Sequence, residues 1–105
     1  MRFTTGNCVA LGVSDLDQAI DLYVNKLGFE LTKRTDKWTE LNSGALMLYL
    51  VSDDVKEPCF EMLVDDVAEA QVMLSGFGYV EVELSDKELF MRDPFGFLFC
   101  ISPRA

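Results

Sequence analysis

Apolar and polar residues alternate in two related patterns along this chain of 105 residues. The first pattern runs from Cys8 to Leu27 and the second from Cys59 to Leu74, so that Cys59 follows Cys8 by 51 positions. Each copy has a short apolar run, then an acidic residue, then apolar residues at helical spacing. The matched pairs are Cys8 with Cys59, Val13 with Val64, Asp15 with Asp66, Leu16 with Val67, and Ala19 with Ala70. Repetition at a fixed period predicts two similar modules of about 50 residues each.

The first module is predicted to be one strand, one helix and three further strands. The strand covers residues 7–13, Ser14 or Asp15 caps the helix, and Gly28 ends it. Strands follow at about 29–35, 37–41 and 45–51, the last two joined by a turn at Asn42-Ser43-Gly44. Helical spacing predicts a buried stripe of Leu16, Ala19, Ile20, Tyr23 and Leu27.

The second module repeats this plan. A strand at 59–64 leads into a helix that Asp66 caps, and strands follow at 79–84, 88–92 and 97–102. The predicted buried stripe of the helix is Val67, Ala70, Met73 and Leu74. The sequence therefore predicts one α+β domain over residues 1–105, with a βαβββ module at about 1–52, a polar linker at about 52–58, and a second βαβββ module at 59–105.

Composition narrows the classes of function. The formal charge is −9, from 18 acidic and 9 basic residues, and no histidine is present. Such a charge disfavours nucleic acid as a partner, because binding a polyanion depends on basic side chains. No apolar run approaches the ~20 residues of a membrane span, and no signal peptide is recognisable, so a cytoplasmic protein is expected. Three cysteines, an odd number, do not suggest a disulfide framework.

Three local motifs resemble those of the vicinal oxygen chelate superfamily, which includes glyoxalases, extradiol dioxygenases and bleomycin-resistance proteins. They are a strand ending in V-x-D-[LV], a helix ending in Leu27-Gly28-Phe29, and the segment R-D-P-x-G from Arg92 to Gly96. The resemblance covers essentially the whole chain. It implies that the paired modules curl their strands into an open half-barrel cup.

The same resemblance implies where a metal site would lie. Metal-using relatives place ligands seven residues before the Asp of V-x-D and seven residues after the Asp of D-P-x-G. In this chain these positions hold Cys8, Cys59 and Cys100, where histidine and glutamate are usual. The pseudo-symmetric mate of Cys100, counted four residues after Gly44, is Leu48. The usual oxygen and nitrogen donors are therefore absent, and no metal or other cofactor is expected.

The three cysteines allow two interpretations. Cysteine is among the most buried residue types, so they are expected to line an apolar cup floor. Alternatively, three thiolates would suit Cu(I), or Zn²⁺ with an open fourth position, and make the chain a superfamily enzyme or a soft-metal handler. Glu61, two residues after Cys59 on the same strand face, is a candidate fourth ligand or a catalytic base of a metal-free lyase or isomerase.

Two further residues are candidates for ligand contact. Trp38, the only tryptophan, could form a stacking wall or belong to the core, and Leu48 is expected to face the cup. Tyr49 and Phe99 alternate with the cup-facing positions and are expected to pack beneath the helices. Phe95 lies at a turn tip, where it could cover a neighbouring subunit or the cup mouth.

The favoured function is that of a metal-free binding protein which resembles bleomycin-resistance proteins. It would sequester an amphipathic ligand, and the acidic surface favours a cationic one. The expected ligand-binding residues are Cys8, Trp38, Leu48, Cys59, Glu61 and Cys100. Open edge strands favour a homodimer.

Overall fold

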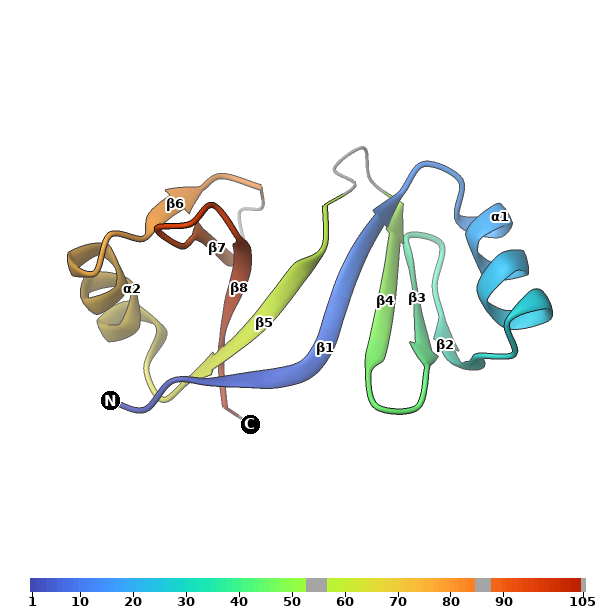
Figure 1. Ribbon diagram of the computed structural model, residues 1–105, viewed down its shortest axis with the longest axis horizontal. Coiled ribbons are helices and arrows are strands. Elements are labelled where there is room, and N and C mark those ends of the chain that lie inside the picture. The colour runs from blue at the N-terminus through green and yellow to red at the C-terminus, as the bar shows by residue number, and fades with distance from the viewer. Residues whose placement is uncertain (53–56, 85–87, 105) are drawn as a thin grey trace. The chain divides into compact units, whose positions relative to one another are not determined.

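The computed structural model describes residues 1–52, 57–84 and 88–104 (Figure 1). The chain divides into two compact units. We call Asn7–Pro58 the N-terminal unit, and Met1–Gly6 together with Cys59–Ala105 the C-terminal unit. The predicted linker at 52–58 falls largely on residues 53–56, which lie outside the described residues. Strand β1 (Thr4–Val13) begins three residues earlier than predicted, so its first residues belong to the C-terminal unit.

The N-terminal unit has the predicted βαβββ order. After β1 come α1 (Leu16–Ile20), the π-helix η1 (Asp21–Lys26), β2 (Glu30–Arg34), β3 (Trp38–Asn42) and β4 (Met47–Ser52). The strands lie in the order β2-β3-β4-β1. Strand β3 is antiparallel to both β2 and β4, whereas β1 and β4 are parallel. The helical crossover is therefore needed to join the unit's parallel strands.

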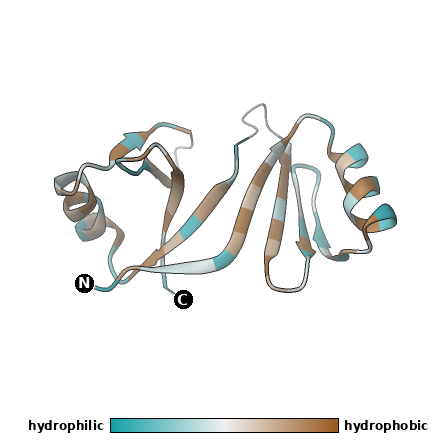
Figure 2. Ribbon diagram, viewed as in Figure 1, coloured by the Kyte–Doolittle hydropathy of each residue, from teal (hydrophilic) through white to brown (hydrophobic). Residues whose placement is uncertain are grey.

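The helix of this unit begins as predicted but ends differently. Asp15 is the N-cap, and its Oδ1 accepts a hydrogen bond from the Gln18 backbone N–H at 3.0 Å. After Ile20 the backbone widens into a π-helix, in which the Leu27 N–H donates to the Leu22 carbonyl. Hydrophobic and hydrophilic residues alternate along this helix (Figure 2). Because a π-turn holds more residues than an α-turn, the apolar spacing loses register, and Leu27 is 56% exposed. The prediction that Leu27 is buried is wrong.

Glycine ends both helical segments with a left-handed backbone. Gly28 has φ +81° and Gly78, after the second helix, has φ +99°. Residues with a Cβ rarely adopt such angles, so these two glycines explain where the helices stop.

One face of the N-terminal sheet forms the buried core of its unit. Thr39, Leu41 and Leu50 are fully buried there, and α1 contacts β4. Leu48 pairs with Leu41 and therefore shares this core face, whereas Tyr49 pairs with Glu40 and Ala10 on the opposite face. The prediction that Tyr49 packs beneath the helix is wrong, and Leu48, predicted to face the cup, lies on the core side of the sheet instead.

A difference in turn length explains this reversal. Strand β8 begins two residues after Gly96, but β4 begins three residues after Gly44. Counting from the glycine therefore selects a position one residue too early, and a shift of one residue moves a side chain to the other face of a strand. Register shows the true equivalence, because Tyr49 lies opposite Ala10 as Cys100 lies opposite Glu61. Tyr49 is the mate of Cys100.

The C-terminal unit repeats the plan with β5 (Cys59–Val64), α2 (Val67–Gly76), β6 (Val80–Val82), β7 (Leu89–Arg92) and β8 (Leu98–Pro103). Its strand order is β5-β8-β7-β6. Asp66 caps α2 as predicted, and Phe99 packs against the core beneath this helix, also as predicted. The core residues are Met62, Val64, Ala70, Leu74, Met91 and Ile101. The predicted α+β fold with two βαβββ modules is confirmed.

Neither of the helical segments in the described residues is long and apolar enough to cross a membrane.

Candidate functional site

Four half-buried side chains lie on the face of the N-terminal sheet that points away from its core. Strand alternation and register place Cys8, Trp38, Glu40 and Tyr49 on this side, which we call the aromatic face. The Trp38 and Tyr49 rings lie with centroids 5.9 Å apart and planes tilted by 56°. Tilted aromatic pairs at this separation are mutually attractive and present a broad apolar surface.

The Glu40 carboxylate is held between two hydroxyl groups. Tyr49 Oη donates to Oε2 at 2.5 Å, and Thr32 Oγ1 lies 2.8 Å from Oε1. The bond from Tyr49, then the one from Thr32, and then the charge of Lys33 lower the pKa of Glu40, against a smaller opposing effect of burial. Glu40 is therefore an ionised carboxylate in a fixed position at neutral pH.

The pKa of Tyr49 shifts in the opposite direction to that of Glu40. The hydrogen bond to Glu40, followed by burial, raises the pKa of Tyr49 above its ordinary value, and the nearby Cys8 thiol adds to the rise. The phenol therefore keeps its proton and acts as a donor. Cys8, Tyr49, Glu40 and Thr32 form a polar row that crosses the sheet.

A β-bulge at Thr32 brings two further residues into place. Leu31 pairs with Leu41, but the next pair is Lys33 with Glu40, so Thr32 is an extra residue in β2. The bulge places Lys33 on the aromatic face, where its Nζ lies 5.4 Å from the centroid of the Trp38 ring. It also sends Arg34 to the core side of the sheet, opposite Thr39.

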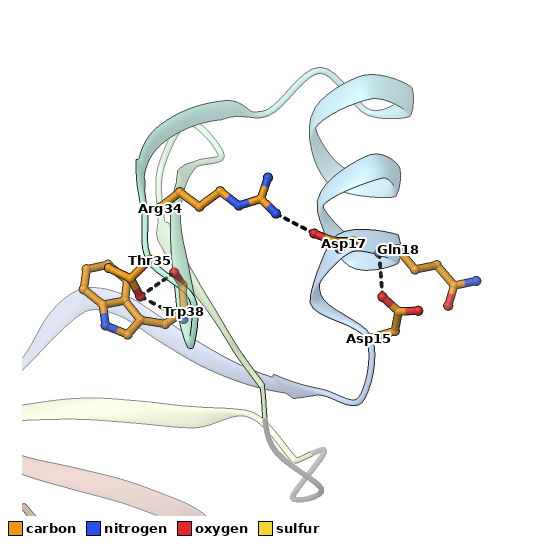
Figure 3. Close-up of polar contacts among 6 residues, drawn as sticks. All are labelled: Asp15, Asp17, Gln18, Arg34, Thr35 and Trp38. Atoms are coloured by element: carbon orange, nitrogen blue, oxygen red, sulfur yellow. Dashed lines mark hydrogen bonds and ion pairs between the residues drawn. The ribbon is translucent and has the colours of Figure 1, made fainter.

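Arg34 there reaches the helix. Its Nη2 lies 2.5 Å from Asp17 Oδ1 of α1 (Figure 3). Around this pair is a pocket of about 390 Å³, lined by residues 14–17 and 34–36. Its polar groups already bind one another, since Asp15 caps the helix and the Thr35 hydroxyl lies 3.1 Å from the Trp38 carbonyl (Figure 3). These contacts position Trp38 and α1, and we assign the pocket this structural role.

The predicted residues of the C-terminal unit meet on one side of β5 and β8. Glu61 pairs with Cys100, and Cys59 lies two residues before Glu61 on the same side. The Glu61 carboxylate lies against Gly6, where a Cβ would stand 2.1 Å from its Oε1. Burial raises the pKa of Cys100, a hydrogen bond with Ser102 opposes this rise, and the charges of Glu88 and Glu61 add to it. Cys100 is therefore a protonated thiol at neutral pH.

These donors do not fit the metal of the family's metalloenzymes. Cys8 belongs to one unit, whereas Cys59 and Cys100 belong to the other. Across residues 1–52, 57–84 and 88–104, no group of three or more Cys, Asp or Glu side chains is arranged to hold a metal ion. A thiol that keeps its proton is also a poor ligand, because metals bind the thiolate.

The structure brings together part of the predicted set. Cys8 and Trp38 share the aromatic face, and Cys59, Glu61 and Cys100 share a face of the other unit, but Leu48 lies on the core side of the N-terminal sheet. Prediction from sequence did not include Tyr49, Thr32, Lys33 or Glu40 among the ligand-binding residues. The repeat already contained a signal for Tyr49, since it precedes Cys100 by the same 51 positions that separate Cys8 from Cys59.

Comparison with solved structures supports the fold. A hypothetical protein from Bacillus halodurans C-125 matches with a TM-score of 0.73 and 12% identity, over 100% of this chain and 96% of that one. A glyoxalase/bleomycin resistance protein/dioxygenase superfamily member from Vibrio splendidus 12B01 matches with a TM-score of 0.65 and 17% identity, over 93% and 97% of the two chains. Homoprotocatechuate 2,3-dioxygenase from Brevibacterium fuscum matches with a TM-score of 0.69 and 19% identity, over 94% of this chain but only 36% of that one.

At these identities the structural matches show the fold alone. No curated protein sequence matches the chain. The family profile described as Glyoxalase/Bleomycin resistance protein/Dioxygenase superfamily matches residues 6–101, which is nearly the whole sequence. The chain belongs to this superfamily.

Proposed function

We propose that this protein is a metal-free binding protein that holds an amphipathic small molecule on its aromatic face without changing it chemically. The observation that carries the proposal is the grouping of Trp38, Tyr49 and Glu40 on neighbouring strands. Small-molecule sites typically combine apolar and aromatic walls with a few fixed polar groups. The two rings supply the wall, and Glu40 supplies a carboxylate that two hydroxyl groups hold in position.

The chemistry of the candidate residues in both units favours binding over catalysis. Tyr49 and Cys100 keep their protons at neutral pH, so neither offers a ready nucleophile. Without imidazole ligands, and with the Cys100 thiol protonated, the metal-dependent reactions of the superfamily have no support from these residues. Bleomycin-resistance proteins within the same superfamily provide the corresponding mode of action, which is to sequester a compound.

A homodimer is part of this proposal. Strands β2 and β6 are the end strands of their units, and within the described residues each pairs with a single neighbouring strand. β2 carries Lys33 and Arg34, whose charges discourage pairing at that edge, whereas β6 has three residues and includes Val80, which is 66% exposed. A second copy could cover this apolar edge. Light scattering coupled to size-exclusion chromatography measures the mass directly, and a monomer at all concentrations would refute the dimer.

Calorimetric titration with two amphipathic cations, bleomycin and ethidium, tests the binding function. We expect at least one to bind the wild type, and Trp38→Leu to weaken that binding at least tenfold. Phe77→Leu is the matched control, because Phe77 is an aromatic residue of the other unit that is 62% exposed. Mass spectrometry of the recovered probe should show it unchanged. The proposal fails if neither probe binds, if Trp38→Leu binds as tightly as wild type, or if the probe returns chemically altered.

A further inference from the structure

The Trp38 ring already has a cation over its face. Lys33 Nζ lies 5.4 Å from the ring centroid, within the range of about 6 Å at which an ammonium group is attracted to an aromatic face. Lys33 is exposed, and its ammonium group sits at the end of a flexible side chain, whereas Trp38 is half-buried. The ring is the fixed partner in this contact, and the ammonium is the movable one.

The bulge in β2 is the cause of this contact. If β2 continued in regular register from the pair Leu31–Leu41, Thr32 would lie opposite Glu40 and Lys33 opposite Thr39, on the core side. The extra residue instead puts Lys33 opposite Glu40 and leaves the Thr32 hydroxyl within 2.8 Å of the same carboxylate. Bulges commonly redirect side chains beside functional sites. Here one bulge adds a cation to the aromatic face and keeps the Thr32 hydroxyl beside the Glu40 carboxylate.

We infer that the ligand of the aromatic face is an organic ammonium ion, and that Lys33 is a tethered competitor which this ion must displace from Trp38. The inference rests on the proposed binding function and names the chemical class of the ligand. The Trp38 face offers the ligand's cation the electrostatic attraction that it now offers Lys33, and the fixed Glu40 carboxylate supplies the countercharge. A neutral molecule of the same shape would displace Lys33 without replacing that attraction.

Lys33 therefore opposes every occupant of the ring, whereas the Trp38 face and the Glu40 carboxylate select for a cation. Any occupant of the ring must first move the lysine, and only a cation recovers the lost interaction. The net charge of −9 also raises the local concentration of cations around the protein. Removing the lysine should strengthen cation binding by about two- to fivefold, which corresponds to one exposed cation–π contact.

The test uses Trp38 fluorescence, which is free of other tryptophan signals because Trp38 is the only one in the chain. The probes are choline, a compact quaternary ammonium ion, and 3,3-dimethylbutan-1-ol, its neutral isostere. Lys33→Met removes the ammonium and keeps an apolar stem, and Lys33→Arg keeps a cation. Lys37→Met is the matched control, because it removes the same charge from the neighbouring turn. Thermal unfolding confirms that each variant is folded.

We expect choline to bind the wild type and Lys33→Arg with similar affinity and Lys33→Met two- to fivefold more tightly. The alcohol should bind each protein more weakly than choline does, and it too should gain in Lys33→Met, because it no longer has to displace the lysine; Lys37→Met should match the wild type. Unchanged or weaker choline binding by Lys33→Met overturns the role of Lys33, as does equal strengthening by Lys37→Met. A separate outcome is that choline binds neither the wild type nor any variant while ethidium or bleomycin still binds the wild type. In that case the assignment of the ligand as an organic ammonium ion is wrong, but the binding function stands. If no probe binds, both are wrong.

Discussion

Tyr49 donates a hydrogen bond to Glu40 across β4 and β3, with 2.5 Å between Oη and Oε2. This bond is the largest cause that lowers the pKa of Glu40. Tyr49→Phe should therefore raise the Glu40 pKa toward its ordinary value of about 4.3. Carboxyl ¹³C NMR titration of the folded protein measures this directly. Thr32→Val should produce a smaller rise, because the bond from Thr32 is the second cause.

The same bond makes a signed prediction about acid stability. A carboxylate whose folded pKa is lowered contributes stability above its unfolded pKa, and loses that contribution as the pH falls through its folded pKa. Tyr49→Phe should therefore lose less of its unfolding free energy than the wild type between pH 5 and pH 2. Thr32→Ser, which keeps the hydroxyl, should behave like the wild type. An unchanged Glu40 titration in Tyr49→Phe would contradict the assignment.

The raised pKa of Tyr49 leads to a prediction about stability at alkaline pH. Its pKa is raised above the ordinary value of about 10, first by the bond to Glu40 and then by burial. A raised folded pKa contributes stability that is present below pH 10 and is lost as the pH rises through the folded value. Tyrosinate absorbance should show late ionisation by Tyr49 and also by Tyr79, whose pKa burial raises as well, and Tyr49→Phe should remove only the Tyr49 step. In Glu40→Gln the Tyr49 step should move to lower pH; if it stays in place, the bond is not the cause.

The sequence predicted the features that depend on local chemistry. Asp15 and Asp66 cap their helices as expected, and glycine follows each helix where the backbone turns left-handed. Both depend on one residue type meeting one local backbone requirement, so a single sequence is enough to find them. The repeat likewise predicted two βαβββ modules, because each module needs the same order of apolar faces.

The aromatic face was harder to predict because it depends on pairing between strands. The bulge at Thr32 depends on how β2 pairs with β3, and no residue in β2 marks it. The error at Leu48 arose from a turn that is one residue longer in the first module. Register errors of one residue exchange the two faces of a strand, so they move a site even when every strand is predicted correctly.

Replacing Thr39 with valine is expected to stabilise the protein. It is fully buried, and its Oγ1 has no hydrogen-bond partner within the described part of the chain. An unsatisfied buried hydroxyl is costly, whereas an apolar group of the same shape is not. Thr39→Val should raise the unfolding free energy by about 1 kcal/mol in urea denaturation. Thr39→Ser, which keeps the hydroxyl and loses the methyl group, should lower it by about 1 kcal/mol. Destabilisation by Val would mean that the hydroxyl has a partner, such as a buried water.

The surroundings of the Cys100 thiol in the C-terminal unit lead to a prediction about its alkylation. Burial raises its pKa, and the charges of Glu88 and Glu61 raise it further, while the hydrogen bond with Ser102 lowers it. In a Cys8→Ser/Cys59→Ser background, alkylation by iodoacetamide should follow a pH profile with its midpoint above the ordinary value of about 8.5. Glu61→Gln should move the midpoint down by removing a negative charge, and Ser102→Ala should move it up by removing the hydrogen bond.

These opposite shifts separate electrostatics from simple access to the reagent. A variant that only loosens the sheet would speed alkylation at every pH and leave the midpoint in place. A midpoint at or below 8.5 would mean that Cys100 forms a thiolate readily, and it would return a thiolate function to consideration. A high midpoint that Glu61→Gln lowers would instead show Cys100 to be a protonated side chain beside a carboxylate, which is how an apolar lining residue behaves.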